Sequence, residues 1–313
     1  MDKDTKDLGL FKIRSVGASV RDGYRLYMDN FRKIFRATWL AAVVYALYKG
    51  LFSTVWVQLF PAIKLGNVNV LWGSEQANPQ LLLFGSLLTA LVLSVLFDAL
   101  LAAFGLSLLR QHKETGSMLP ATRWFGHCDM STLRRTLMAV LAFLVFTIGY
   151  GAFVLLIVRL LGSYLTAISI LGLTALFVIV LFLVTPLVLM RLLRYVLSSE
   201  QKPSLLKQGF PLRHWGGAIL MMLIVGIVSG LLITVTELPA NILTVANVQS
   251  VTGALAGDAT GMPDYMLWLN IIVFTLAGFI RAYISLSAIF PFYYLCGSAE
   301  QQEKERAEVV KNL

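Results

Sequence analysis

The chain has 313 residues, of which 58% are hydrophobic and only 14% are charged. Soluble domains carry about 25% charged residues, and a soluble globule of this size could not bury so much apolar surface, so a soluble protein is excluded. The net charge of +9 would suit nucleic acid, but most Lys and Arg residues flank apolar runs, where they orient membrane spans and contact lipid. The composition predicts an all-α, polytopic membrane bundle with no nucleic-acid partner.

Residues 1–37 are charged and lack the apolar core of a cleavable signal peptide, so we expect them to stay in the cytoplasm. Apolar residues that recur there at helical spacing are Val16, Val20, Tyr24, Tyr27, Phe31 and Phe35. Basic residues that fall on another face are Arg21, Arg25, Arg32 and Arg36. This pattern predicts an amphipathic helix in the headgroup plane, with its apolar stripe in acyl chains and its arginines near anionic lipid phosphates.

Six apolar runs follow, each long enough to cross the roughly 30 Å hydrocarbon core as a helix. The predicted spans are Thr38–Phe60, Leu81–Leu109, Thr136–Val158, Leu165–Met190, Gly217–Val235 and Leu267–Phe290. They form a predicted transmembrane domain over residues 38–290. The mostly uncharged connection Thr236–Met266 could hold a short helix on the outer surface. Residues 291–313 are polar and helix-prone, and we expect a cytoplasmic helical tail there.

The positions of the Lys and Arg residues predict the orientation. Nine precede the first span, five lie in each of the connections 110–135 and 191–213, and three lie in the tail. The opposite side holds only Lys64 and Arg159. Because basic residues accumulate on the cytoplasmic side, both termini are expected to be cytoplasmic.

Three cytoplasmic stretches resemble one another, because each is basic and aromatic and precedes a pair of spans. They are the residues before the first span, "MLPATRWFGHCDMSTLRR" before the third and "LLKQGFPLRHWGG" before the fifth. We interpret them as three degenerate repeats, each an interfacial segment followed by a helical hairpin. Chance similarity among membrane flanks is the alternative interpretation.

No catalytic, cofactor or metal signature is present in the sequence. It contains no Walker A, GxSxG, HExxH or dinucleotide-binding pattern. The run His127-Cys128-Asp129 lacks the paired spacing of a metal site. Cys128 and Cys296 both fall on the predicted cytoplasmic side, where free thiols are expected.

Three charges lie deep inside the predicted spans: Lys49, Asp98 and Arg281. At about 1.5 Å per helical residue, all three lie roughly 18–20 Å from the cytoplasmic boundary. Each would cost about 2.5–3.5 kcal/mol if it faced lipid, so we expect them to meet in the bundle interior. Because two of the three are cations, they could form a site for an anionic ligand; a structural ion pair is the alternative. Arg159 and Glu237 are expected to be interface anchors near outer span ends.

The amphipathic basic N-terminal helix, followed by "NFRKIFRATWL" at the start of the first span, resembles a poorly characterised bacterial superfamily. That group includes the membrane domain attached to some glycerophosphodiester phosphodiesterases and several stand-alone six-helix proteins. The resemblance is architectural and covers about residues 15–297. It implies a six-helix bacterial membrane fold. Only 16 residues follow Gly297, too few for the phosphodiesterase barrel, so the enzymatic activity and catalytic residues are not carried over.

These observations favour a non-enzymatic bacterial inner-membrane protein that organises the envelope or binds a membrane partner. The alternative is a transporter or lipid-handling protein that uses Lys49, Asp98 and Arg281 for an anionic ligand, and a membrane-embedded enzyme comes third. A cavity that reaches Asp98 would favour transport, whereas a closed bundle would favour scaffolding.

Overall fold

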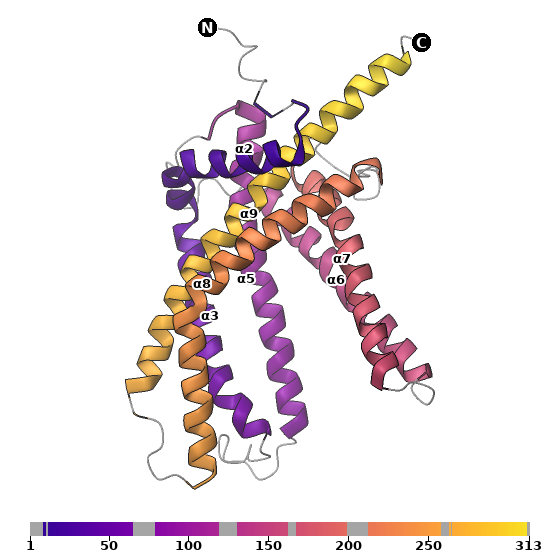
Figure 1. Ribbon diagram of the computed structural model, residues 1–313. Coiled ribbons are helices and arrows are strands. Elements are labelled where there is room, and N and C mark those ends of the chain that lie inside the picture. The colour runs from indigo at the N-terminus through magenta and orange to yellow at the C-terminus, as the bar shows by residue number, and fades with distance from the viewer. Residues whose placement is uncertain are drawn as a thin grey trace. The chain divides into compact units, whose positions relative to one another are not determined.

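In a computed structural model, the chain is described over residues 9–10, 12–64, 79–118, 130–161, 167–198, 212–257, 263 and 265–311, and it contains helices but no strand there. The helices are α2 (Val16–Asp29), α3 (Phe31–Lys64), α5 (Pro79–Thr115), α6 (Met130–Leu161), α7 (Ala167–Val196), the 3-10 helix η1 (Leu212–His214), α8 (Trp215–Leu255) and α9 (Tyr265–Lys311) (Figure 1). Within the described residues, six helices are long and apolar enough to cross a membrane. The chain is therefore a multi-pass, all-helical membrane protein, as predicted.

Two helices are much longer than their predicted spans. Helix α8 continues to Leu255. The predicted connection Thr236–Met266 therefore holds no separate surface helix up to Leu255, because these residues extend the spanning helix. After Glu237 no charged residue occurs before Asp258, and nothing in the sequence ends the helix at Val235. Helix α9 has 47 residues and includes the expected helical tail. At about 1.5 Å per residue it is roughly 70 Å long, more than twice the thickness of a bilayer core.

The chain divides into two compact units. The first unit comprises Met1–Ala37, Ala103–Ile227 and Ser287–Leu313, and the second comprises Thr38–Ala102 and Val228–Leu286. Helices α3, α5, α8 and α9 each contribute a segment to both units.

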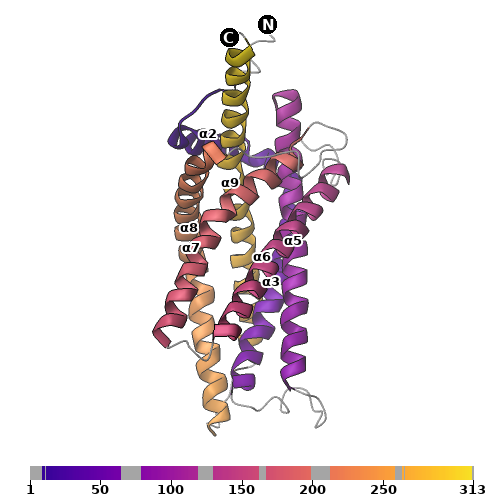
Figure 2. The ribbon, with the colours of Figure 1, turned by 90° about the vertical axis from the view of Figure 1, so that its right-hand side faces the viewer.

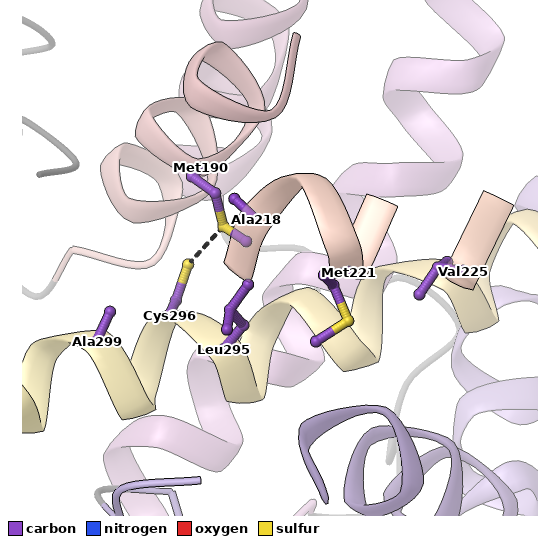
Figure 3. Close-up of a cluster of buried hydrophobic side chains, with 7 residues drawn as sticks. All are labelled: Met190, Ala218, Met221, Val225, Leu295, Cys296 and Ala299. Carbon is purple, nitrogen blue, oxygen red and sulfur yellow. Dashed lines mark hydrogen bonds between the residues drawn. The ribbon is translucent and has the colours of Figure 1, made fainter. Parts of the chain in front are cut away.

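The core of the first unit lies among the C-terminal end of α7, the N-terminal part of α8 and the second half of α9. It is formed by Met190, Ala218, Met221, Val225, Leu295, Cys296 and Ala299 (Figure 3). The Cys296 thiol is buried and free, and its sulfur lies 3.4 Å from Sδ of Met190. A free thiol was expected at this position, and the structure confirms it; Cys128 lies outside the described residues.

Helix α2 packs on α9 within the first unit. A Cβ atom at Gly23 would lie only 2.6 Å from the backbone nitrogen of Pro291, so the two helices touch through their backbones there. The rings of Tyr27 and Phe290 meet edge to face at 5.1 Å, and Val16 and Val20 pack against the core. The prediction that this apolar stripe enters acyl chains is therefore wrong for these side chains, because the protein itself covers them.

The same N-terminal segment is not one continuous helix. Helix α2 ends at Asp29, and α3 begins at Phe31 after a single turn residue, Asn30. The Asn30 side chain donates a hydrogen bond to the carbonyl of Leu26 at 3.1 Å, and its backbone carbonyl accepts from Lys33 at 2.9 Å. Arg21 and Arg25 therefore belong to α2, whereas Arg32 and Arg36 belong to α3.

Helices α6 and α7 of the first unit form a hairpin (Figure 2). The rings of Tyr150 and Phe177 stack with centroids 4.4 Å apart. The Tyr150 hydroxyl also donates a hydrogen bond to the carbonyl of Phe177 at 3.1 Å. A half-buried hydroxyl in an apolar hairpin is stabilised by such a partner.

In the second unit, α8 runs antiparallel to α9. Asn247 and Asn270 are fully buried and exchange two side-chain hydrogen bonds of 2.8 and 2.9 Å. Further along the pair, Ala240 packs with Phe274 and Ala277. As the residue number rises on α8 it falls on α9, which places Glu237 opposite the turn that carries Arg281.

Candidate functional site

A pocket of about 250 Å³ lies among α3, α8 and α9 in the second unit. Its charged lining residues are Lys49, Glu237 and Arg281. Its aromatic lining residues are Phe52, Trp56 and Phe274, and its polar ones are Ser53, Asn241 and Thr244. A hollow with an apolar wall and a few convergent polar groups is typical of small-molecule sites.

Small residues bring α3 and α9 together beside this pocket. A Cβ atom at Gly278 would lie 3.2 Å from Cβ of Lys49 and 3.3 Å from Cα of Ala46. Gly50 faces Thr275 in the same way, and a Cβ there would lie 3.0 Å from the Thr275 backbone nitrogen. Close backbone approach through small residues is a common way to pack membrane helices. Here it brings Lys49 and Arg281 to one pocket.

Arg281 forms an ion pair with Glu237. Nη1 of Arg281 donates a hydrogen bond of 2.7 Å to Oε1 of Glu237, and the two side chains are 41% and 24% exposed. Glu237 was expected to be an interface anchor that reaches water, and the structure instead pairs its carboxylate with Arg281. Because α8 does not end at Val235, Glu237 lies within the helix and can face α9. Arg159, its expected counterpart, is exposed in the last turn of α6.

Lys49 has a different environment. Its Nζ donates a hydrogen bond of 2.9 Å to Oγ of Ser94 on α5, and it lies 5.6 Å from the centroid of the Tyr45 ring. Arg281 is already held by Glu237, whereas Lys49 has a hydroxyl partner and, among the described residues, no carboxylate at ion-pair distance. Of the two lining cations, Lys49 is therefore the better placed to bind an anion.

Asp98 lies next to this group but does not line the described pocket. Its carboxylate interacts electrostatically with Lys49 and Arg281 and accepts a hydrogen bond from Tyr45. Its side chain is nevertheless exposed on the surface of the chain. The structure thus brings the three predicted charges together, but it does not bury them in a closed bundle as expected.

Glu237 changes the charge of the group. Lys49, Asp98 and Arg281 alone carry one net positive charge, whereas the four residues together are neutral. Of these four charged residues, only Lys49, Arg281 and Glu237 line the pocket, so the pocket lining carries one net positive charge. Charges at membrane depth are costly unless they face partners, water or a polar ligand. The pocket supplies a space in which these side chains can face one.

A second cluster of charges lies in the first unit, where the ends of α5 and α7 and the short helix η1 meet α9. Glu300 of α9 is 3.4 Å from Lys113 and 3.8 Å from Arg194. Glu303, one turn later, is 3.3 Å from Arg194 and 3.9 Å from His214. The cavity beside Glu300 measures only about 10 Å³, so this cluster is closed and joins α5, α7 and η1 to α9. This cluster was not predicted, although the basic residues of three predicted cytoplasmic segments and the acidic residues of the tail indicate it.

The four arginines predicted to contact lipid are all exposed. On α2, Arg21 lies 3.3 Å from Asp22, and Arg25 lies 3.6 Å from Asp29. On α3, Arg32 and Arg36 have no carboxylate partner among the residues that the structure describes.

Asp22 ties the N-terminal segment to α2 through Arg14. Nε of Arg14 lies 3.0 Å from Oδ2 of Asp22, and the guanidinium lies 4.7 Å from the Tyr294 ring centroid. Burial raises the pKa of the Asp22 carboxyl, but hydrogen bonds and charge attraction from Arg14 and Arg21 outweigh it, and the net pKa is lowered.

No group of three or more His, Cys, Asp or Glu residues placed to hold a metal ion is found within the described part of the chain. His127, Cys128 and Asp129 lie outside it. Comparisons of the chain with protein-family models, with curated proteins and with solved structures found no match.

Proposed function

We propose that this chain is a non-enzymatic protein of a bacterial inner membrane that binds an anionic amphiphile in the pocket of the second unit. The observation that supports this most strongly is the pocket of about 250 Å³, in which Lys49, Arg281 and Glu237 meet aromatic side chains. The pocket reaches Lys49 and Arg281 but not Asp98, so only two of the three predicted charges can support ligand handling. A scaffold needs no such hollow, whereas a transporter or lipid-handling protein does.

The lining defines the chemistry of the ligand. Lys49 offers its ammonium group to an anion, while Glu237 holds Arg281 in place at 2.7 Å. Phe52, Trp56 and Phe274 offer apolar surface to a chain or ring attached to that anion. A molecule with one acidic group and an apolar body fits both parts.

The orientation that we propose has both termini in the cytoplasm. It rests on the 22 Lys and Arg residues that lie on one side of the predicted spans, against two on the other. Cys128 should then react with an impermeant thiol reagent only from the cytoplasmic side. Labelling of Cys128 from the periplasm of intact cells would show that the orientation is the opposite one.

Mass spectrometry of lipids and metabolites that co-purify with the protein from native membranes tests the proposal. We expect the wild-type chain to retain a stoichiometric acidic amphiphile that Lys49→Gln and Arg281→Gln lose. The matched control is Arg159→Gln, which removes an exposed cation of α6 and should retain the ligand. Equal recovery from all four proteins would overturn the proposal, as would recovery of zwitterionic lipids alone.

The scaffold role stays the second candidate, and one surface of the first unit supports it. Val309 and Val310 are exposed near the end of α9 and line a shallow groove together with Ile13, Arg213 and Arg306. If a protein binds there, Val309→Asp with Val310→Asp should release it from the native complex, while Lys49→Gln should not.

A further inference from the structure

The corner between α2 and α3 presents a mixed surface of arginines and large apolar side chains. We call Met28, Phe31, Arg32, Phe35 and Arg36 the corner surface. Met28 is 68% exposed, Phe31 41% and Phe35 38%, and both arginines are exposed as well. This surface belongs to the first unit and shares no residue with the proposed ligand pocket.

The buried residues of the corner determine which side chains face outward. Tyr27 and Ile34 are buried, and Gly23 contacts the backbone of Pro291. Because helical side chains four residues apart lie on one face, Phe31 and Phe35 form one row, and Arg32 and Arg36 form the adjacent row. The ring centroids of Phe31 and Phe35 lie 6.1 Å apart. The apolar row and the basic row therefore run side by side.

From this arrangement we infer that the corner surface binds the headgroup of an anionic glycerophospholipid. The candidate membrane span of α3 covers Phe31–Val57, and the apolar run within it begins at Thr38, so we expect the corner to lie near the headgroup level. Lipid phosphates lie at that level, and arginine binds a phosphate through paired N–H donors. The phenylalanines and Met28 would enter the adjacent acyl region, as apolar side chains of interfacial helices do.

The residues that we expect to touch lipid are only part of the amphipathic pattern predicted from the sequence. The stripe of Val16, Val20 and Tyr27 packs against protein and is not available. Arg21 and Arg25 already have carboxylates within 3.3 and 3.6 Å. Arg32 and Arg36, without such partners among the described residues, are the arginines that can bind a phosphate.

Native mass spectrometry of the purified full-length chain tests the inference, with phosphatidylglycerol and phosphatidylcholine of the same acyl chains as probes. We expect the wild-type protein to bind phosphatidylglycerol more tightly. Arg32→Gln with Arg36→Gln should weaken that binding by roughly thirty-fold, the equivalent of about 1 kcal/mol per cation. Arg306→Gln with Lys311→Gln removes the same charge from the exposed end of α9 and serves as the matched control.

A lysine variant and a crosslinking measurement test the same surface if the glutamine variant does not fold. Arg32→Lys with Arg36→Lys keeps both charges but loses the paired donors, so it should bind phosphatidylglycerol more weakly than wild type and more tightly than the glutamine variant. Photo-crosslinking of the wild-type chain with a diazirine-labelled phosphatidylglycerol should modify the peptide 28–36. Absence of adducts there, or equal affinity of wild-type and glutamine proteins, would overturn the inference and leave an acidic protein as the partner of this surface. The retained amphiphile of the second unit should be the same in all these variants.

Discussion

Each unit of this protein contains a cluster of buried or half-buried charges, and the two clusters use their side chains in opposite ways. In the first unit, Glu300 and Glu303 are surrounded by basic residues, and the adjacent cavity measures about 10 Å³. In the second unit, Lys49 and the pair of Arg281 with Glu237 line a pocket of about 250 Å³. The ion pairs of Glu300 and Glu303 thus hold helices together without leaving space for a ligand. The charges around Arg281 line an open pocket instead.

The comparison shows that a cluster of charges in a membrane protein does not by itself identify a functional site. Space beside the charges is the additional requirement. Lys113 and Arg194 are only 16% and 14% exposed and contact carboxylates, so they have no room for a ligand. Arg281 is 41% exposed toward a pocket although it too has a carboxylate partner.

The largest effect is expected from closing the pocket of the second unit at Gly278. A Cβ there meets Cβ of Lys49 at 3.2 Å, so Gly278→Leu must separate α3 from α9. We expect a loss of about 3 kcal/mol in unfolding free energy, measured by SDS titration in mixed micelles, together with loss of the amphiphile. Gly230→Leu on α8 is the control, because no heavy atom lies within 4 Å of its Cβ position. Equal stability of the two variants would show that the close approach does not form.

The next prediction compares the same substitution, glutamate to glutamine, in the closed cluster and in the open pocket. Glu300→Gln leaves Lys113 and Arg194 without one carboxylate in a confined space. We expect a loss of about 2 kcal/mol in unfolding free energy with the ligand retained. Glu237→Gln should cost less, about 1 kcal/mol, because its pair is more exposed, but it should weaken ligand binding. If Glu237→Gln lost more unfolding free energy than Glu300→Gln, the cluster of the first unit would not be the more confined of the two.

Sequence reasoning predicted the six spans and the proximity of Lys49 and Arg281 for identifiable reasons. Apolar length alone decides whether a helix can span, and depth in a span depends only on distance along the chain. Depth fixes one coordinate of a side chain and leaves the rotation of its helix open. That is why Asp98, at the same depth, is exposed while Lys49 and Arg281 share a pocket.

Two other features could not be predicted in this way. An amphipathic stripe has the same sequence pattern whether it contacts lipid or protein. The packing of Val16 and Val20 on the core therefore could not be predicted from that pattern. The pairing of Glu237 depended on α8 continuing past Val235. One signal was present: Glu237 is the only acidic residue between Gly217 and Asp258, and a lone carboxylate in an apolar run needs a partner.

A smaller effect is expected at the edge of the second unit. Asp98 interacts with Lys49 and Arg281 but is exposed, so Asp98→Asn should cost only about 1 kcal/mol in unfolding free energy, measured by the same SDS titration. A fully buried partner would cost about 3–5 kcal/mol. If Lys49 holds the ligand, Asp98→Asn should strengthen binding, because it removes a competing negative charge. Weaker binding would show that Asp98 itself contacts the ligand.

The smallest effect concerns Asp22 in the first unit and depends on pH. Its pKa is lowered from the ordinary value of 3.8, because Arg14 and Arg21 outweigh the opposing effect of burial. A lowered pKa means that the ion pair stabilises the protein above pH 4 or so, and that this contribution is lost as pH falls through the folded-state pKa.

Asp22→Asn should therefore reduce the unfolding free energy by about 0.5 kcal/mol at pH 7, and the difference from wild type should vanish near pH 2. SDS titrations of both proteins across this pH range measure the difference. Asp29→Asn is the control on the same helix, since Asp29 is 65% exposed and its partner Arg25 is 79% exposed. A difference that persists unchanged at pH 2 would show that Asp22 stabilises α2 by packing or by hydrogen bonds of its neutral form. Charge attraction between Asp22 and Arg14 would then contribute nothing to stability.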